Sequence, residues 1–148
     1  MERGHPGAPS AAAAGTIAYE LLTGLSDRAE RVYSSPVMRA VQTAQILADS
    51  LRAPLEITEA LREWSVGIYE GTAQPAGWEL HRQVQDDWFI HGKLDSRMPG
   101  GESFCDTRER FAPFVEGLVR KGRSTDQKVV LVGHGGLYMA MLPEIFGN

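Results

Sequence analysis

The chain has 148 residues, 43% of them hydrophobic, and this length predicts one domain, residues 1–148, with a single core. Its formal net charge of −4 excludes a general attraction to nucleic acids or anionic membranes, so an anion site requires a local cluster of basic side chains. A single cysteine, Cys105, excludes an internal disulfide and favours a cytoplasmic location, and no stretch approaches the roughly 20 apolar residues of a membrane span.

The first residues are predicted to form a flexible lead-in. Residues 1–14 combine glycines and prolines with an alanine run that is too short for a signal-peptide core. Residues 16–25 then predict a helix.

A strand over residues 31–34 and a helix over residues 36–51 are predicted next, with Ser35 as the N-cap and Pro36 at the first helical position. Apolar residues at spacings of four and three form the core-facing stripe of this helix: Val37, Val41, Ala44, Ala48 and Leu51. Arg39 lies off the stripe, in a first turn where a cation opposes the helix dipole. This position indicates either a nearby anion or an ordinary solvated arginine.

A short strand over residues 55–57 leads into a glycine-punctuated loop, the Glu63 loop (residues 61–71), with aromatic and aliphatic neighbours. A carboxylate held against apolar rings has its protonated form favoured, as a general acid for a departing oxygen requires. Glu63 is therefore a candidate general acid, with an ordinary loop acid as the alternative.

Two more helices are predicted, over residues 78–90 and from Phe104 to Leu118. Ser103 is expected to cap the second, which Pro113 should bend or interrupt. The histidines on or just past the first helix, His81 and His91, are expected to have surface or helix-end roles.

The last strand, residues 128–132, is an apolar run expected to be buried on both faces. The strand is followed by His134, which is set among three glycines, and residues 137–146 predict the closing helix. His134 therefore lies where open α/β sheets bind ligands and where helix amides favour anions, although a loop histidine satisfied by backbone is the alternative. The alternation of strands and helices predicts a mainly parallel sheet covered on both faces.

Together, these segments resemble the histidine phosphatase superfamily, also called the phosphoglycerate mutase-like family. The resemblance covers residues 15–146 and rests on four segments, which are Ser34-Ser35-Pro36 with the following Arg39, the Glu63 loop, Pro99-Gly100-Gly101-Glu102-Ser103, and Gly133-His134-Gly135-Gly136. It implies a three-layer α/β/α sandwich that works without metal or cofactor. It also implies that Arg39 binds phosphate, that His134 is the second histidine contacting the phosphate, and that Glu63 donates a proton to the leaving group.

The amino end departs from the family. Family members open with a buried central strand ending in Arg-His-Gly, whose histidine becomes phosphorylated, whereas this chain has Arg3-Gly4-His5 with no preceding apolar run. The usual first strand is therefore expected to be missing, and both ends are expected to be abbreviated. Either His5 replaces the nucleophile, or Gly4 matches the motif glycine and the nucleophile is absent. Pro6 restricts His5 toward extended geometry, and a disordered terminal histidine is the remaining alternative.

The resemblance implies hydrolysis of a small phosphorylated substrate through a phosphohistidine. A phosphoglycerate mutase is the enzymatic alternative. A catalytically impaired phosphate-binding or interaction protein is the alternative from another class, because the Arg-His-Gly motif is not intact. Neither nucleic acid nor membrane is an expected partner, and self-association into a homo-oligomer is left open.

Overall fold

The computed structural model describes residues 29–123 and 128–147. They fall into two compact units, one from residues 29–61 and 128–132 and one from residues 62–123 and 133–147. The predicted lead-in, the predicted helix over residues 16–25 and the expected absence of a first strand lie outside the described residues. The single domain stays a prediction.

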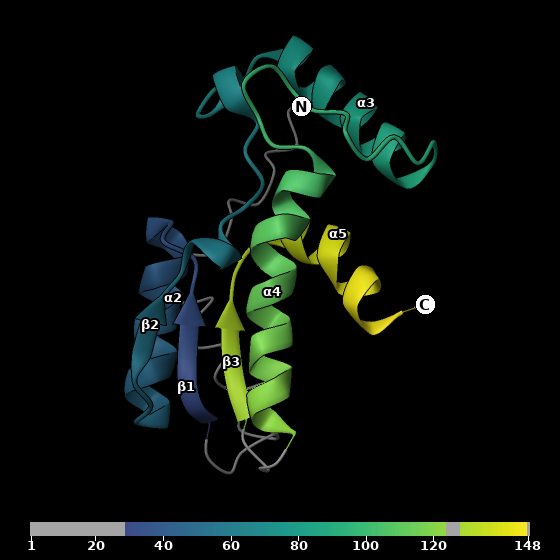
Figure 1. Ribbon diagram of the computed structural model, residues 1–148. Helices are drawn as coiled ribbons and strands as arrows, with labels where there is room; N and C mark the ends of the chain where they lie inside the picture. Colours follow the sequence, from purple (N-terminus) through teal and green to yellow (C-terminus); the bar gives the residue numbers. More distant parts are fainter. Residues whose placement is uncertain (1–28, 124–127, 148) are drawn as a thin grey trace, which may run out of the picture. The chain divides into compact units, whose positions relative to one another are not determined.

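The first unit contains a parallel three-stranded sheet in the order β2-β1-β3. Its strands are β1 (Ala29–Ser34), β2 (Leu55–Ile57) and β3 (Lys128–Val132). Figure 1 shows β1 and β3 side by side with their arrowheads at the same end. The predicted parallel sheet is thus confirmed, and the α/β class with it.

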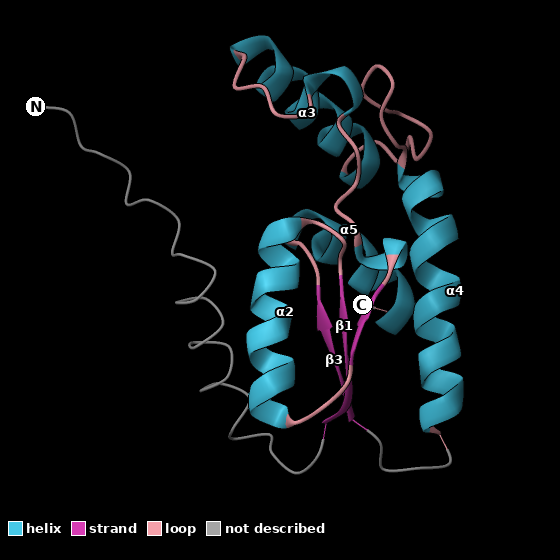
Figure 2. Ribbon diagram, turned by 90° about the vertical axis from the view of Figure 1, so that its left-hand side faces the viewer, coloured by secondary structure: helices cyan, strands magenta, loops and turns pink. Residues whose placement is uncertain are grey.

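Helix α2 (Met38–Leu51) packs against this sheet, as Figure 2 shows. Its small buried residues Ala44 and Ala48 form a core with Val32 of β1. Because alanine has a short side chain, the helix can lie close to the strands. The predicted stripe is confirmed at these two positions, while its other members are only half-buried.

The start of α2 differs from the prediction. The helix begins at Met38, its N-cap is Val37, and no side chain caps it. Ser35 is fully buried, and its hydroxyl oxygen accepts the Val37 N–H at 3.3 Å, which closes a turn before the helix. The Ser35 N–H donates to the Val132 carbonyl at 2.8 Å, so pairing with β3 keeps Ser35 at the strand end rather than at the cap.

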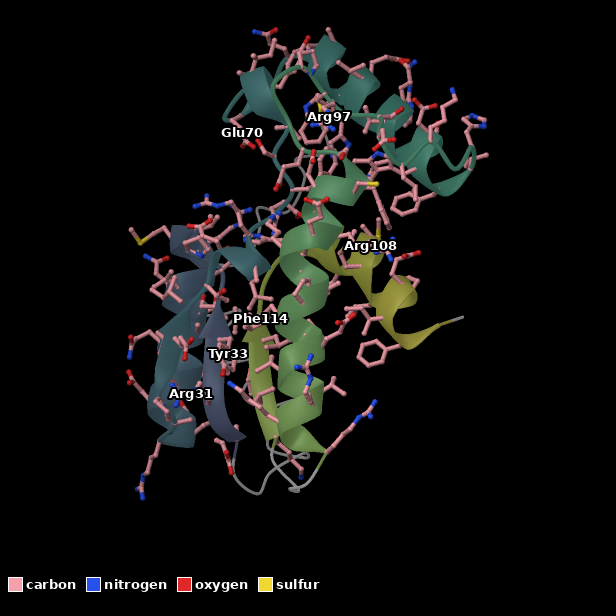
Figure 3. The ribbon with its side chains drawn as sticks, viewed as in Figure 1. Arg31, Tyr33, Glu70, Arg97, Arg108 and Phe114 are labelled. Carbon is pink, nitrogen blue, oxygen red and sulfur yellow. The ribbon has the colours of Figure 1, made fainter. Side chains whose placement is uncertain are left out.

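Strand β3 is less buried than expected. Val129 is 40% exposed, and the strand becomes half-buried only toward its carboxyl end. Because its first two residues are exposed and its last three are half-buried, the expectation of burial on both faces is wrong. On the other side of β1, Arg31 forms an ion pair with Glu56 of β2 at 3.2 Å (Figure 3).

The second unit contains three α-helices in its described part: α3 (Pro75–Phe89), α4 (Phe104–Gly122) and α5 (Gly135–Phe146). Helix α4 begins with a reciprocal capping box between Ser103 and Asp106, which confirms the predicted cap. Pro113 lies inside α4, which continues past it, so of the two expected effects the interruption does not occur and the bend stays a prediction. Arg108 of α4 lies 3.9 Å from the Glu144 carboxylate of α5, and Figure 3 shows its side chain on the α5 side.

Among the described residues, no helix is long and apolar enough to cross a membrane.

Candidate functional site

His134 occupies the N-cap position of α5, two residues after β3 ends, as the sequence predicts. Its backbone is extended, with φ −130° and ψ 151°, and its carbonyl accepts the Tyr138 N–H at 3.1 Å. The residue is only 6% exposed. A buried imidazole thus stands at a helix N-terminus, where the backbone amides favour a negatively charged group.

The carboxylate of Glu63 lies at the same helix end, although it is 73 residues away from Gly136 in the chain. Its Oε2 accepts the Gly136 N–H at 3.1 Å, and its Oε1 accepts the Trp64 N–H at 3.2 Å. A Cβ on Gly136 would stand 2.9 and 3.0 Å from the two carboxylate oxygens, so only glycine permits this approach. Glu63 and His134, two of the predicted site residues, therefore share one helix terminus.

The surroundings of Glu63 include polar groups that the sequence did not predict, because backbone N–H groups contact both of its oxygens. These bonds orient the carboxylate. The ring beside it belongs to Trp64, which is 3% exposed.

Glu102 holds the Glu63 loop in place, a role that the sequence did not reveal. Its Oε2 accepts the Ser65 N–H at 2.9 Å, and its own N–H donates to the Ser65 carbonyl at 2.9 Å. Arg110 of α4 donates to both oxygens of Glu102, at 2.8 and 2.9 Å, and to the Glu63 carbonyl at 3.4 Å. Burial raises the pKa of Glu102, but the bonds from Arg110 and Ser65 outweigh it, so that pKa lies below its ordinary value.

The turn at residues 99–101 packs on the same loop through backbone atoms. The Ile68 N–H donates to the Pro99 carbonyl at 3.1 Å, and Gly67 has a left-handed φ of 62°. A Cβ on Gly67 would lie 2.1 Å from the Pro99 oxygen and 2.5 Å from atoms of Gly100 and Gly101. The Pro-Gly-Gly-Glu segment therefore leads toward α4 and also packs against Gly67 of the Glu63 loop.

His81 differs from the expected surface histidine. Its ring stacks on Trp64 with 4.7 Å between centroids and 21° between planes, and Trp64 also meets Trp88 edge-on at 4.8 Å. Burial lowers the pKa of His81, and the negative charge of Glu63 acts in the opposite direction. In the sequence, His81 lies three residues after Trp78 on a predicted amphipathic helix. Such a position cannot identify a stacking partner outside the helix. His91 is exposed, as expected.

The other two predicted site residues are Arg39 and His5. Arg39 lies in the first turn of α2, exposed and off the core-facing stripe, and it belongs to the first unit. That Arg39 and His134 contact one anion stays a prediction. His5 lies outside the described residues. Within these residues, no group of three or more His, Cys, Asp or Glu is arranged to hold a metal ion.

Tyr138 presents a buried hydroxyl that has no hydrogen-bond partner among the described residues. A Cβ on Gly133 would stand 2.6 Å from this oxygen, and burial raises the pKa of Tyr138 to about 12. The ring itself meets Phe111 of α4 edge-on at 6.3 Å.

We expect Tyr138→Phe to leave the free energy of unfolding unchanged or to raise it by up to about 1 kcal/mol. The substitution removes an unsatisfied buried hydroxyl while it keeps the contact with Phe111. Urea denaturation of both proteins measures this. A loss of more than about 1 kcal/mol would mean that the hydroxyl has a partner outside the described residues.

Comparison with known proteins gives concordant results. The pattern that describes the histidine phosphatase superfamily (branch 1) matches residues 15–148. A glucosyl-3-phosphoglycerate phosphatase of Mycolicibacterium vanbaalenii is 32% identical over 127 residues, which cover 78% of this chain and 53% of that protein. A metal-independent phosphoserine phosphatase of Arabidopsis thaliana is 31% identical over 125 residues, which cover 82% of this chain and 51% of that protein.

A solved structure is similar over most of the described fold. It is a mycobacterial glucosyl-3-phosphoglycerate phosphatase in complex with VO3, with a TM-score of 0.65 and 27% identity, and the match covers 88% of this chain and 63% of the other. The chain spans between 51% and 59% of the length of the first curated relatives.

Proposed function

The chain belongs to the histidine phosphatase superfamily, and we propose that it hydrolyses small phosphomonoesters without a metal ion. The observation that carries this proposal is the Glu63 carboxylate bonded to the Gly136 N–H at 3.1 Å, two residues after the buried His134. An acid, an imidazole and a helix N-terminus at one place are the parts that transfer of a phosphoryl group requires. The phosphatases among the relatives favour hydrolysis over a mutase reaction.

In the proposed reaction, an imidazole nitrogen attacks phosphorus and the bond from phosphorus to the ester oxygen breaks. Glu63 gives its proton to that oxygen, so the product leaves as a neutral alcohol. Water then attacks the phosphohistidine, Glu63 takes back a proton, and inorganic phosphate leaves. His134 and Arg39 hold and neutralise the phosphoryl oxygens in both steps.

The identity of the attacking imidazole divides the proposal into two versions. In the first, His5 attacks, although Arg3-Gly4-His5 departs from the order Arg-His-Gly. In the second, the nucleophile is absent and the chain binds phosphate without turning it over, because loss of one coupled catalytic group commonly costs several powers of ten in rate. Glu63 and His134 retain the same positions in both versions.

We place this activity in the cytoplasm, in line with the single cysteine, and we propose a small phosphorylated molecule as the substrate.

Rapid quenching during turnover identifies the nucleophile. If His5 attacks, incubation with a phosphate ester should trap an acid-labile phosphohistidine, His5→Ala should abolish it, and His91→Ala, which alters an exposed histidine after α3, should not. Vanadate binding without a trapped intermediate would support the binding protein instead. Turnover that survives His5→Ala but depends on His134 would refute both versions, because His134 itself would then attack.

A further inference from the structure

A cavity of about 120 Å³ lies between α3 and the Glu63 loop, and no step of the proposed reaction uses it. Its walls include Val66 and Tyr69 of the loop, Trp78 and His81 of α3, and Met98; we call it the α3 cavity. All of these residues belong to the second unit. A cavity of about 150 Å³ with apolar walls holds a benzene ring, so the α3 cavity approaches the size of one aromatic ring.

Two stacked rings connect the α3 cavity to the proposed acid. His81 forms part of its wall and stacks on Trp64, the residue that follows Glu63, with 4.7 Å between ring centroids. Val66, three residues after Glu63, forms another part. Because Glu63 would protonate the ester oxygen, the carbon atoms attached to that oxygen must lie close to this acid.

Among the described residues, the walls carry no lysine, arginine, aspartate or glutamate. The Thr72 hydroxyl in the wall already donates to the Tyr69 carbonyl at 3.0 Å, and burial of His81 lowers its pKa, which favours its neutral form. Trp78 is 64% exposed and offers an aromatic surface. The Gln74 amide in the wall can donate a hydrogen bond but carries no charge, so no cationic side chain of the described walls would compensate a carboxylate, whereas an apolar or aromatic group would bury its surface favourably.

The other side of α3 differs sharply in charge. A separate hollow there is lined by Glu79, Arg82, Asp86, Asp87, His91 and Lys93. Most of these charges pair with one another, for example Arg82 with Glu79 at 2.9 Å and Lys93 with Asp87 at 3.0 Å. One helix therefore has a charged side and an uncharged side, and the uncharged side forms the α3 cavity together with the Glu63 loop.

Tyr69 is held against α3 by the absence of a side chain at Gly77. A Cβ on Gly77 would stand 2.7 Å from a ring carbon of Tyr69, so the ring packs directly on the helix backbone. One wall of the α3 cavity is therefore an aromatic ring, and its contact with the backbone of α3 sets its position.

We propose that the α3 cavity binds the alcohol portion of the phosphate ester and selects an uncharged apolar or aromatic alcohol over one that carries a carboxylate. This inference rests on the proposed function and specifies its substrate class. This selectivity would distinguish the chain from relatives named for phosphoserine or glucosyl-3-phosphoglycerate, which are esters that carry a carboxylate.

Binding of two non-hydrolysable phosphonates tests the selectivity. We expect benzylphosphonate to bind about tenfold more tightly than phosphonoacetate in calorimetric titrations, because burial of a ring contributes at least about 1.4 kcal/mol. Trp78→Ala should remove most of this preference, and Thr72→Lys, which introduces a cation into the wall, should reverse it. Gln83→Ala and Gln83→Lys, on the charged side of the same helix, are the matched controls and should change neither affinity.

A titration with benzyl alcohol, which has no phosphate group, tests binding in the cavity independently of the proposed function. In the full-length protein it should shift the indole N–H resonance of Trp78, and Gln83→Ala should preserve that shift. No shift, or equal affinity for the two phosphonates, would overturn the inference about the α3 cavity. A shift without binding of inorganic phosphate or of either phosphonate would refute the phosphate site and, with it, the assignment of this cavity to an ester.

Discussion

Glu63→Gln is expected to lower kcat/KM about 10²- to 10⁴-fold for alkyl phosphomonoesters, the range typical of general acid catalysis. An alkoxide is a poor leaving group and requires the proton that Glu63 would give. The loss should be far smaller for 4-nitrophenyl phosphate, whose phenolate leaves without protonation. Glutamine retains an oxygen that can accept the Gly136 N–H, so the loop should keep its position. Steady-state kinetics on both substrates measures the contrast.

Glu70→Gln is the matched control for this experiment. Glu70 lies in the same loop, is exposed, and accepts a backbone N–H from Val66 at 3.0 Å, as Glu63 does from Gly136 at 3.1 Å (Figure 3 labels Glu70). Among the described residues, no hydrogen bond or ion pair joins it to α5, so its amide variant should retain activity on both substrates. Equal loss on alkyl and aryl esters in Glu63→Gln would argue against proton donation and for a purely structural role.

Gly67→Ala is expected to lower the free energy of unfolding by about 3–5 kcal/mol, which is large for one methyl group. Gly67 has a left-handed φ, and its added Cβ would stand 2.1 Å from the Pro99 carbonyl oxygen. Backbone atoms cannot rotate out of the way as a flexible side chain can. The turn at residues 99–101 must therefore move away from the Glu63 loop, and activity should fall together with stability.

Gly71→Ala isolates the contribution of the backbone conformation. Gly71 also has a left-handed φ, of 69°, but nothing lies within 4 Å of its added Cβ. We expect this variant to lose only about 1–2 kcal/mol, the cost of that conformation for a residue with a side chain. Urea denaturation of the two variants gives the comparison. Equal losses would show that the packing of Pro99 on Gly67 contributes little to stability.

The sequence predicted the local elements well. The bounds of β2 and β3 match the expected strands over residues 55–57 and 128–132, and Ser103 caps α4 as expected. These features follow from side-chain periodicity and from hydrogen bonds between residues at most a few positions apart. The start of α2 was missed because a contact with β3, distant in the chain, holds Ser35 outside the helix.

The candidate site shows a similar division. His134 was found because the glycines around it and the apolar run before it are local signals, and Glu63 was found as a carboxylate among aromatic and aliphatic neighbours, to which the resemblance to a family added its role. Their meeting at the N-terminus of α5 was not predictable from periodicity, since Glu63 and Gly136 are 73 residues apart. The same is true of His81, whose stacking partner Trp64 lies outside its own helix.

By itself, the sequence determined which residues form strands, helices and the glycine-rich turn at His134, because backbone sterics, capping and apolar spacing act over a few residues. Only the tertiary structure decided that Glu102 and Arg110 hold the Glu63 loop, that Gly136 admits the Glu63 carboxylate, and that the α3 cavity has uncharged walls. The physical reason is that these features depend on how distant segments pack. A charged residue has the same letter in the sequence whether it pairs with a distant arginine or faces water.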